Sequence, residues 1–151
     1  MPIMNYTTEI AVSKTMGEIQ DSLARRGVRS ISTILDDEGR PAGLGFVMDT
    51  DYGLREFELP VKTEGVLAAM RNDPKVPKAK QNPEQAARVA WRIAADWLKA
   101  QAALIDAQLA TLDEVMMPYM VARHAGGRPV TMYAAFRERQ LSLTDGTETK
   151  S

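Results

Sequence analysis

The sequence contains no cysteine, a single histidine and few aromatic residues, and each shortage excludes a class of chemistry. Without cysteine, the chain cannot form disulfides, iron–sulfur clusters or Cys-ligated zinc sites, and it has no thiol nucleophile. The lone His124 is accompanied by neither a G-x-S-x-G nor an HExxH sequence. A Walker loop and a dinucleotide fingerprint are also missing. We therefore expect no enzymatic activity, no cofactor and no metal site.

Long apolar runs and a surplus of one charge are lacking as well. No apolar run approaches the roughly 18 residues of a membrane-spanning helix. The start MPIMNYTTEI does not have the charged-then-apolar order of a secretory leader. With 19 basic and 20 acidic residues, the net charge of −1 does not draw the whole molecule to DNA or to a membrane. We expect a cytoplasmic protein in which anion binding depends on local clusters of charge.

The length of 151 residues predicts one domain. We expect a β-rich part over residues 1–62, a helical part over 63–141 and a frayed polar tail over 142–151. The periodicity of apolar residues predicts the order β-α-β-β-β, followed by helices. This is an α+β fold with a small antiparallel sheet.

Alternation of apolar and polar residues predicts a half-buried strand over residues 5–12. The following segment KTMGEIQDSLARRG has helical spacing, with Ser13 as its N-cap and Gly27 at its end. The turn-rich stretches DDEGR and DTDYG then join alternating segments into a three-strand meander. The glycines of GLG leave one face of the middle strand bare, for close packing or for a ligand. The meander is expected over 28–35, 41–50 and 54–61.

The longest helix of the helical part is predicted to begin at Asn82-Pro83-Glu84, which has the residues of an N-cap and a first helical turn. The predicted helix has about 26 residues and a length of about 39 Å. Two adjoining apolar rows make its apolar face too broad to cover only one side of a small sheet, so a second helix or a second subunit should cover it. Thr111 should cap a further helix, broken at Pro118, and a turn at AGGRP should precede a last helix, with a strand as the alternative.

One stretch, Arg71–Arg92, concentrates positive charge, with six basic and two acidic residues. Lysines lie on the loop before the long helix, whose free N–H groups suit an anion. Arg88 and Arg92 lie one helical turn apart, so both could reach one phosphate. Tyr52 or Trp91 could stack on a base. The predicted ligand-binding residues are Lys75, Lys78, Lys80, Gln85, Arg88, Arg92 and Tyr52.

A plainer interpretation of the same stretch remains open. Runs of charge are usually solvated surface, and Arg92 and Asp96 could form an ion pair within the helix. Trp91 is by its type a core residue rather than a stacking platform. The sequence therefore predicts an anion site, with a solvated surface as the alternative.

The stretches YTTEIAVSKTMGEIQDSLARRGV and PEQAARVAWRIAADWLKAQAALIDAQLATLDEVMMPYMV, the latter followed by the turn GGRPV, resemble a family of small phage-encoded proteins of unassigned role. The resemblance covers residues 5–135 and carries no functional residues. The general plan is also similar to phage anti-defence proteins of the Thoeris and CBASS sponge type. That resemblance implies a homo-oligomer in the host cytoplasm that sequesters a small nucleotide signal, such as a cyclic nucleotide or a cyclic ADP-ribose variant.

Two alternatives remain open at the level of sequence. A nucleic-acid-binding accessory protein of phage replication or recombination could use the same basic residues, although such proteins are usually basic throughout. A protein–protein inhibitor could instead block a host factor through a helical face. The sequence favours capture of a small phosphorylated nucleotide.

Overall fold

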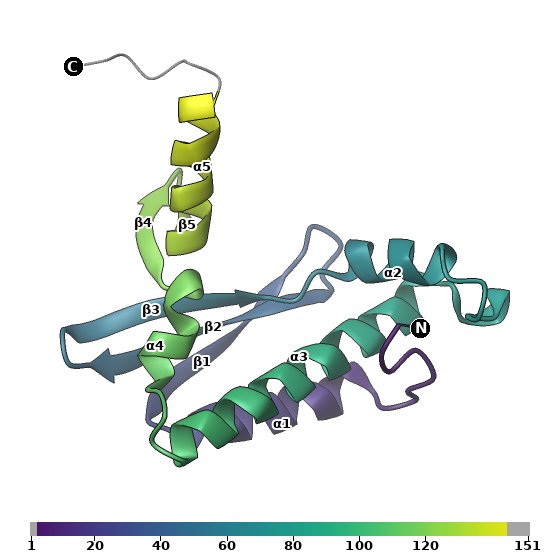
Figure 1. Ribbon diagram of the computed structural model, residues 1–151, viewed down its shortest axis with the longest axis horizontal. Helices are drawn as coiled ribbons and strands as arrows, with labels where there is room; N and C mark the ends of the chain where they lie inside the picture. The colour runs from purple at the N-terminus through teal and green to yellow at the C-terminus, as the bar shows by residue number, and fades with distance from the viewer. Residues whose placement is uncertain (1–2, 145–151) are drawn as a thin grey trace.

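The computed structural model of the protein describes residues 3–144. Figure 1 shows a small sheet with helices on one face, and a hairpin and a helix that stand away from it. In chain order the elements are α1 (Val12–Ala24), β1 (Val28–Leu35), β2 (Pro41–Thr50), β3 (Gly53–Pro60), α2 (Thr63–Arg71), the 3-10 turn Lys78–Lys80, α3 (Pro83–Asp106), α4 (Leu112–Met116), the 3-10 turn Met117–Tyr119, β4 (Val121–Ala125), β5 (Arg128–Thr131) and α5 (Met132–Thr144).

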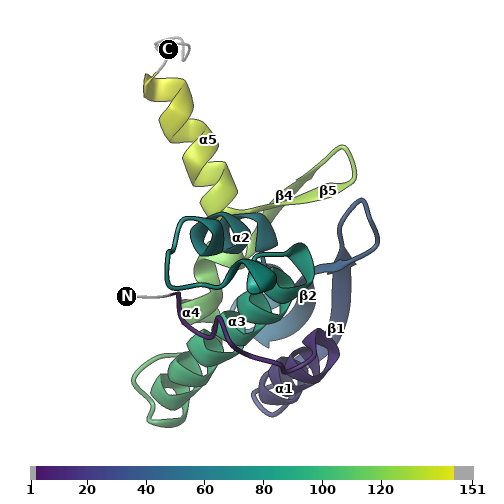
Figure 2. The same cartoon turned by 90° about the vertical axis from the view of Figure 1, so that its right-hand side faces the viewer.

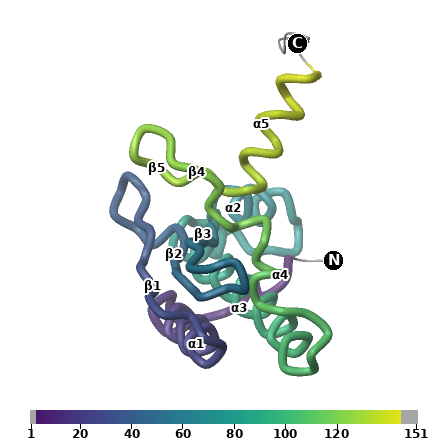
Figure 3. Tube along the Cα trace, turned by 90° about the vertical axis from the view of Figure 1, so that its left-hand side faces the viewer, coloured from purple at the N-terminus to yellow at the C-terminus, as the bar shows by residue number. Residues whose placement is uncertain are grey.

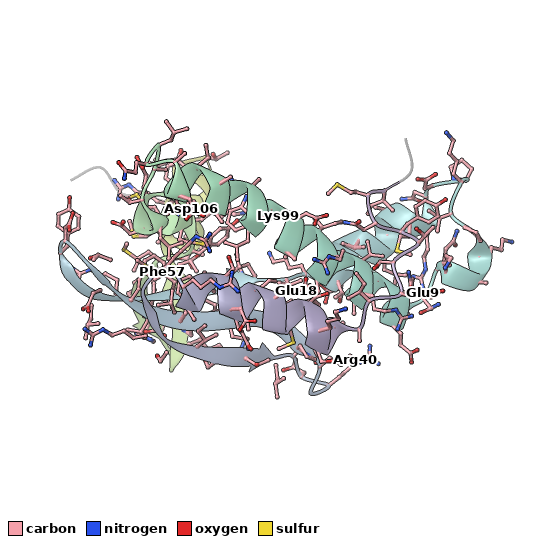
Figure 4. The ribbon with its side chains drawn as sticks, turned by 90° about the horizontal axis from the view of Figure 1, so that it is seen from below. Glu9, Glu18, Arg40, Phe57, Lys99 and Asp106 are labelled. Carbon is pink, nitrogen blue, oxygen red and sulfur yellow. The ribbon has the colours of Figure 1, made fainter. Side chains whose placement is uncertain are left out.

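The predicted meander is confirmed as an antiparallel sheet in the order β1-β2-β3. Helices α1 and α3 lie side by side on one face of this sheet (Figures 1 and 4). The core lies between the two layers, where the stacked rings of Phe46 and Phe57 meet Trp91. A Cβ atom on Gly43 would lie 2.6 Å from the carbonyl oxygen of Leu59, so glycine at this position permits close packing.

The strand predicted over residues 5–12 is wrong, because side chains of α3 bind this segment in place of a neighbouring strand. Gln85 donates hydrogen bonds of 2.9 Å to the carbonyls of both Tyr6 and Thr8. Asn5 turns the chain with a φ of 65° and donates its side-chain amide to Asp96. The chain therefore begins with α1, which starts at Val12 without the predicted Ser13 cap.

The long helix forms as predicted at its start, where the Asn82 side chain accepts a hydrogen bond from the Gln85 N–H. It ends at Asp106, a few residues earlier than expected. Its broad apolar face is covered within the chain, since α1 and the sheet bury Trp91 and Leu98 and a second cluster with α2 buries Val89. The chain itself therefore covers most of this face, whereas Leu104 near the end of α3 stays exposed.

The C-terminal part differs most from expectation. The predicted helix after Thr111 is confirmed only as α4, which begins with a capping box, and a 3-10 turn at Pro118 ends it. Residues 121–131 then form the hairpin β4–β5, whereas the sequence predicted no strand before the AGGRP turn and a strand only as the alternative after it. The last helix is confirmed as α5, and it extends through residues 142–144, which were expected to be frayed. The rest of the predicted tail, 145–151, lies outside the described residues.

Hairpin β4–β5 and α5 form an arm, residues 121–144, that stands away from the body (Figure 2). Strands β4 and β5 contact β3 where the arm begins. A bridge between Phe57 and Met120 attaches its base to the sheet. Helix α5 contains no buried residue. Within residues 3–144, no helix has the length and apolar character needed to cross a bilayer.

Candidate functional site

The starts of three helices surround a cavity of about 740 Å³, which we call the helix-start cavity. Its walls come from the first residues of α1, α2 and α3, the β1–β2 turn and the end of β3. Apolar side chains such as Met16, Ile34 and Val61 line part of it. Pockets of about 300–1,000 Å³ with an apolar lining and a few polar groups are typical small-molecule sites. The charged residues on its walls are Arg40, Lys62, Arg88, Asp36, Glu58, Glu64 and Glu84.

A buried amide fixes the orientation of Arg88 at this cavity. Gln85 is 4% exposed, and its Oε1 accepts a hydrogen bond of 2.9 Å from Nε of Arg88. The Nε2 of the same amide is occupied by Tyr6 and Thr8. Gln85 is therefore committed to holding its neighbours. The two terminal nitrogens of the half-buried Arg88 have no partner within residues 3–144 and are available to an anion.

Backbone donors add to the positive character of the cavity. The N-cap residues of α1 and α2, Ala11 and Lys62, provide no side-chain hydrogen bond to the first helical turn. Both residues border the cavity. Uncapped helix starts present free N–H groups and a partial positive charge. These groups supplement the guanidinium of Arg88.

Three of the four carboxylates at the cavity have structural roles. Asp36 Oδ1 accepts hydrogen bonds from the backbone of Glu38 and Arg40 in the β1–β2 turn. Glu64 and Glu84 lie in the first turns of α2 and α3, where a negative charge stabilises the helix dipole. Backbone hydrogen bonds or a helix dipole already stabilise the negative charge of these three acids.

Glu58 is the remaining carboxylate, and its surroundings disfavour the charged form. Burial raises the pKa of its carboxyl above the ordinary value of 4.5, and the nearby charge of Glu56 raises it further. It makes no hydrogen bond or ion pair within residues 3–144. A carboxylate in this state is well suited to accept hydrogen bonds from the hydroxyl or amino groups of a ligand.

A smaller hollow of about 240 Å³ adjoins the cavity and shares Arg88 with it. Lys80 and Glu9 line this hollow together with Gln85. The structure thus brings together three of the predicted residues, namely Lys80, Gln85 and Arg88.

The other predicted lysines lie apart from this group. Lys75 and Lys78 are exposed and border neither hollow. Their loop is anchored, because Val76 is buried and its carbonyl accepts a hydrogen bond of 3.0 Å from the Gln81 side chain. These contacts attach the loop to the folded body.

Tyr52 is also distant from Arg88. It is 76% exposed in the turn between β2 and β3. Figure 1 places this turn at the opposite end of the sheet from α2 and the start of α3. Trp91, the other candidate for stacking, is fully buried in the core.

Arg92 faces a different hollow from Arg88, so the two do not share one phosphate site. Its guanidinium pairs with Glu18 of α1 at 2.6 Å, and its side chain is 17% exposed. The expected pair with Asp96 is not formed, since Asp96 accepts from Asn5. Arg92 lines the groove between α1 and α3, where Glu18 and Lys99 lie on the two sides (Figure 4).

Sequence reasoning missed Arg40, Lys62 and Glu58, which come from separate segments. Only the fold brings the β1–β2 turn and the end of β3 to the start of α3. The stretch TEGVLAAMRN predicts a short helix with Thr63 as its cap. The cap is wrong, because the structure has Lys62 in the N-cap position, where its side chain makes no capping hydrogen bond.

Comparison with protein-family models, curated proteins and solved structures finds no match to this chain. Residues 3–144 contain no group of three or more histidine or acidic side chains placed to hold a metal ion. His124 lies in β4 with its Nε2 3.3 Å from Glu56. The case for function therefore depends on the helix-start cavity.

Proposed function

We propose that this protein binds a small phosphorylated nucleotide in the helix-start cavity and holds it without a chemical step. The observation that carries the proposal is Arg88, which Gln85 holds at the wall of a cavity of about 740 Å³ with its terminal nitrogens unpaired within the described residues. A guanidinium in a fixed orientation binds phosphate through two parallel hydrogen bonds.

The mixed charge of the cavity favours a nucleotide over a simple anion. Arg88, Lys62 and the free N–H groups of α1 and α2 would bind the phosphates. Glu58 would accept hydrogen bonds from a ribose hydroxyl or an amino group of the base. The apolar wall around Met16 and Val61 would contact the flat face of the base.

Sequestration is the biological role that we attach to this binding. A phage-encoded protein of this kind, acting in the host cytoplasm, would withhold a nucleotide signal such as a cyclic nucleotide or a cyclic ADP-ribose variant. The proposal assigns no reaction to the cavity, so a bound nucleotide should leave the protein unchanged.

A nucleic-acid-binding role has weaker support from the charges. The groove between α1 and α3 contains Arg25, Arg26, Arg92 and Lys99. Two of these four are already used, because Arg26 pairs with Asp106 and Arg92 with Glu18. A surface that neutralises a phosphate backbone needs unpaired cations.

The test is a thermal-shift panel of cyclic AMP, cyclic di-AMP, cyclic di-GMP, cyclic ADP-ribose and inorganic phosphate. We expect at least one nucleotide to raise the melting temperature at concentrations where inorganic phosphate does not, because the base and ribose add contacts. Heating the complex should then release the nucleotide with its mass unchanged. A panel without any shift, or a released product of altered mass, would contradict the proposal.

A further inference from the structure

Helix α5 presents large apolar side chains to solvent although it belongs to a folded arm. Five of its large side chains are exposed, and Phe136 is 60% exposed. The helix is held at its base by the Arg123–Glu138 ion pair and by a hydrogen bond from the Ala134 N–H to the Thr131 hydroxyl. An ordered helix with an unpartnered apolar side is typical of an interaction surface.

Four of the five exposed large side chains lie on one side of α5, and Leu141 lies on the opposite side. At about 100° per residue, Met132, Tyr133, Phe136 and Leu143 fall within one stripe about 100° wide. Arg137 follows Tyr133 around the helix and Arg139 follows Met132, so an arginine flanks the stripe on each side. The stripe thus has four large apolar side chains with Gln140 among them, and an arginine at each margin.

A hollow of complementary character lies at the corner between α3 and α4. Its volume is about 530 Å³, and its lining includes Met48, Ile105, Leu109 and Leu112. Leu109 is 73% exposed at its mouth. Asp113 and Glu114 are the acidic residues of its lining, and the Glu114 carboxylate also accepts a hydrogen bond from the Thr111 N–H. Arg26 also borders this corner hollow, but its guanidinium is paired with Asp106.

The α5 stripe cannot reach the corner hollow of its own chain. Figures 1 and 3 show α5 pointing away from the body on the side opposite the α3–α4 corner. Pairing of α5 with α5 of a second copy would bring arginines of both chains to the margins of one seam, where like charges repel. The acidic residues of the corner hollow instead match the basic margins of the stripe.

We propose that the α5 stripe of one chain docks into the corner hollow of a second copy. Each chain has one stripe and one hollow, so the contact is heterologous and builds a ring or a filament. Phe136 would fill the apolar centre of the hollow, and Arg137 would face Asp113 and Glu114. This assembly is independent of nucleotide binding, because the helix-start cavity lies at the other end of the body.

The test uses light scattering after size exclusion on the wild type and on two variants that each disable one half of the contact. Phe136→Asp places a charge in the apolar stripe, and Leu109→Asp places a charge in the corner hollow. We expect the wild type to exceed the mass of one 16.7 kDa chain and each variant alone to run as a single chain. An equimolar mixture of the two variants should form a species of two chains, because one intact stripe and one intact hollow remain.

A mixture that stays at the mass of one chain would overturn the heterologous contact, as would a wild type that runs as a single chain. Leu35→Asp, at an exposed leucine at the opposite end of β1 from the strand pair that holds Met48, serves as the control and should keep the wild-type mass. Leu143→Asp repeats the stripe test at a second position. Circular dichroism melts should match the wild type, since all of the replaced side chains are exposed.

Discussion

Gln85 links the N-terminal segment to the guanidinium that we assign to phosphate binding. Its amide makes three hydrogen bonds, two to the carbonyls of Tyr6 and Thr8 and one from Arg88. The residue is buried in the first turn of α3. A single side chain therefore holds both the N-terminal segment and the main cation of the cavity.

We predict that Gln85→Leu lowers both stability and nucleotide affinity. Two carbonyls lose their donors, which should cost about 1–3 kcal/mol in the free energy of unfolding for each group left unpaired. Arg88 also loses the acceptor that orients its guanidinium. Nucleotide affinity should therefore fall, although the Gln85 amide is bonded to Tyr6, Thr8 and Arg88 and would not itself contact the nucleotide. Urea unfolding and titration calorimetry measure the two effects. Gln101→Leu on the same helix is the control, and an equal loss there would contradict this account.

Glu58 makes stability depend on pH in a defined direction. Its pKa lies above the ordinary value of 4.5 in the folded protein because of burial and then of Glu56. The folded state thus holds the proton to higher pH than the unfolded state does. The contribution of Glu58 to stability is complete below pH 4.5 and is lost as pH rises through the folded pKa.

We predict that Glu58→Gln raises the melting temperature at about pH 7 and that the gain disappears at about pH 4, where the wild-type carboxyl is protonated. Calorimetric melts across this range provide the measurement. Asp51→Asn, in the exposed β2–β3 turn, should keep the wild-type pH profile. A gain from Glu58→Gln that is equally large at both pH values would show that its charge is not the cause.

At the scale of elements, helix starts with local caps could be predicted from the sequence and contacts between distant segments could not. Asn82 and Thr111 act on residues three positions further along, so their roles follow from local spacing. The segment 5–12 has a strand-like pattern, but Gln85, which is 77 and 79 residues away in sequence, donates hydrogen bonds to its carbonyl groups. The strands β4 and β5 are short, and the sequence pattern around them indicated a helix and a turn.

The same limit applies to the candidate site. The Asn82-Pro83 start and Arg88 could be predicted because they belong to one segment. Arg40 and Glu58 could not, since the sheet alone brings them to the start of α3. Arg92 was grouped with Arg88 by helical spacing, but its partner Glu18 comes from α1 and draws it into another groove.

The Asn82 cap offers a prediction for α3 as an element. Asn82→Ala should lower the free energy of unfolding by about 0.5–2 kcal/mol, because the Gln85 N–H loses its acceptor. Asn72→Ala is a matched control at the end of α2, where the cap uses backbone groups only. Chemical denaturation compares the two variants. The predicted role of the cap fails if both variants lose the same amount.

At the scale of the whole molecule, the sequence predicted a broad apolar face on the long helix that needs a partner, whereas the structure has a group of large exposed apolar side chains on α5. The broad face of α3 is covered by α1, α2 and the sheet, whereas α5 leaves large side chains exposed. The helix starts that line the helix-start cavity and the α3–α4 corner that lines the corner hollow lie at opposite ends of the body (Figure 1). Assembly through α5 would therefore leave the helix-start cavity open to its ligand.

The proposed nucleotide binding depends on contact between Arg88 and a phosphate. Titration calorimetry of the cyclic nucleotide panel against Arg88→Gln and Arg92→Gln tests it most directly, because the two changes are chemically identical and the residues lie one turn apart on α3. We predict that Arg88→Gln weakens binding by about 10- to 100-fold, as expected for a lost hydrogen-bonded charge, and that Arg92→Gln binds like the wild type. Equal affinities for Arg88→Gln and the wild type, or a loss confined to Arg92→Gln, would contradict the account.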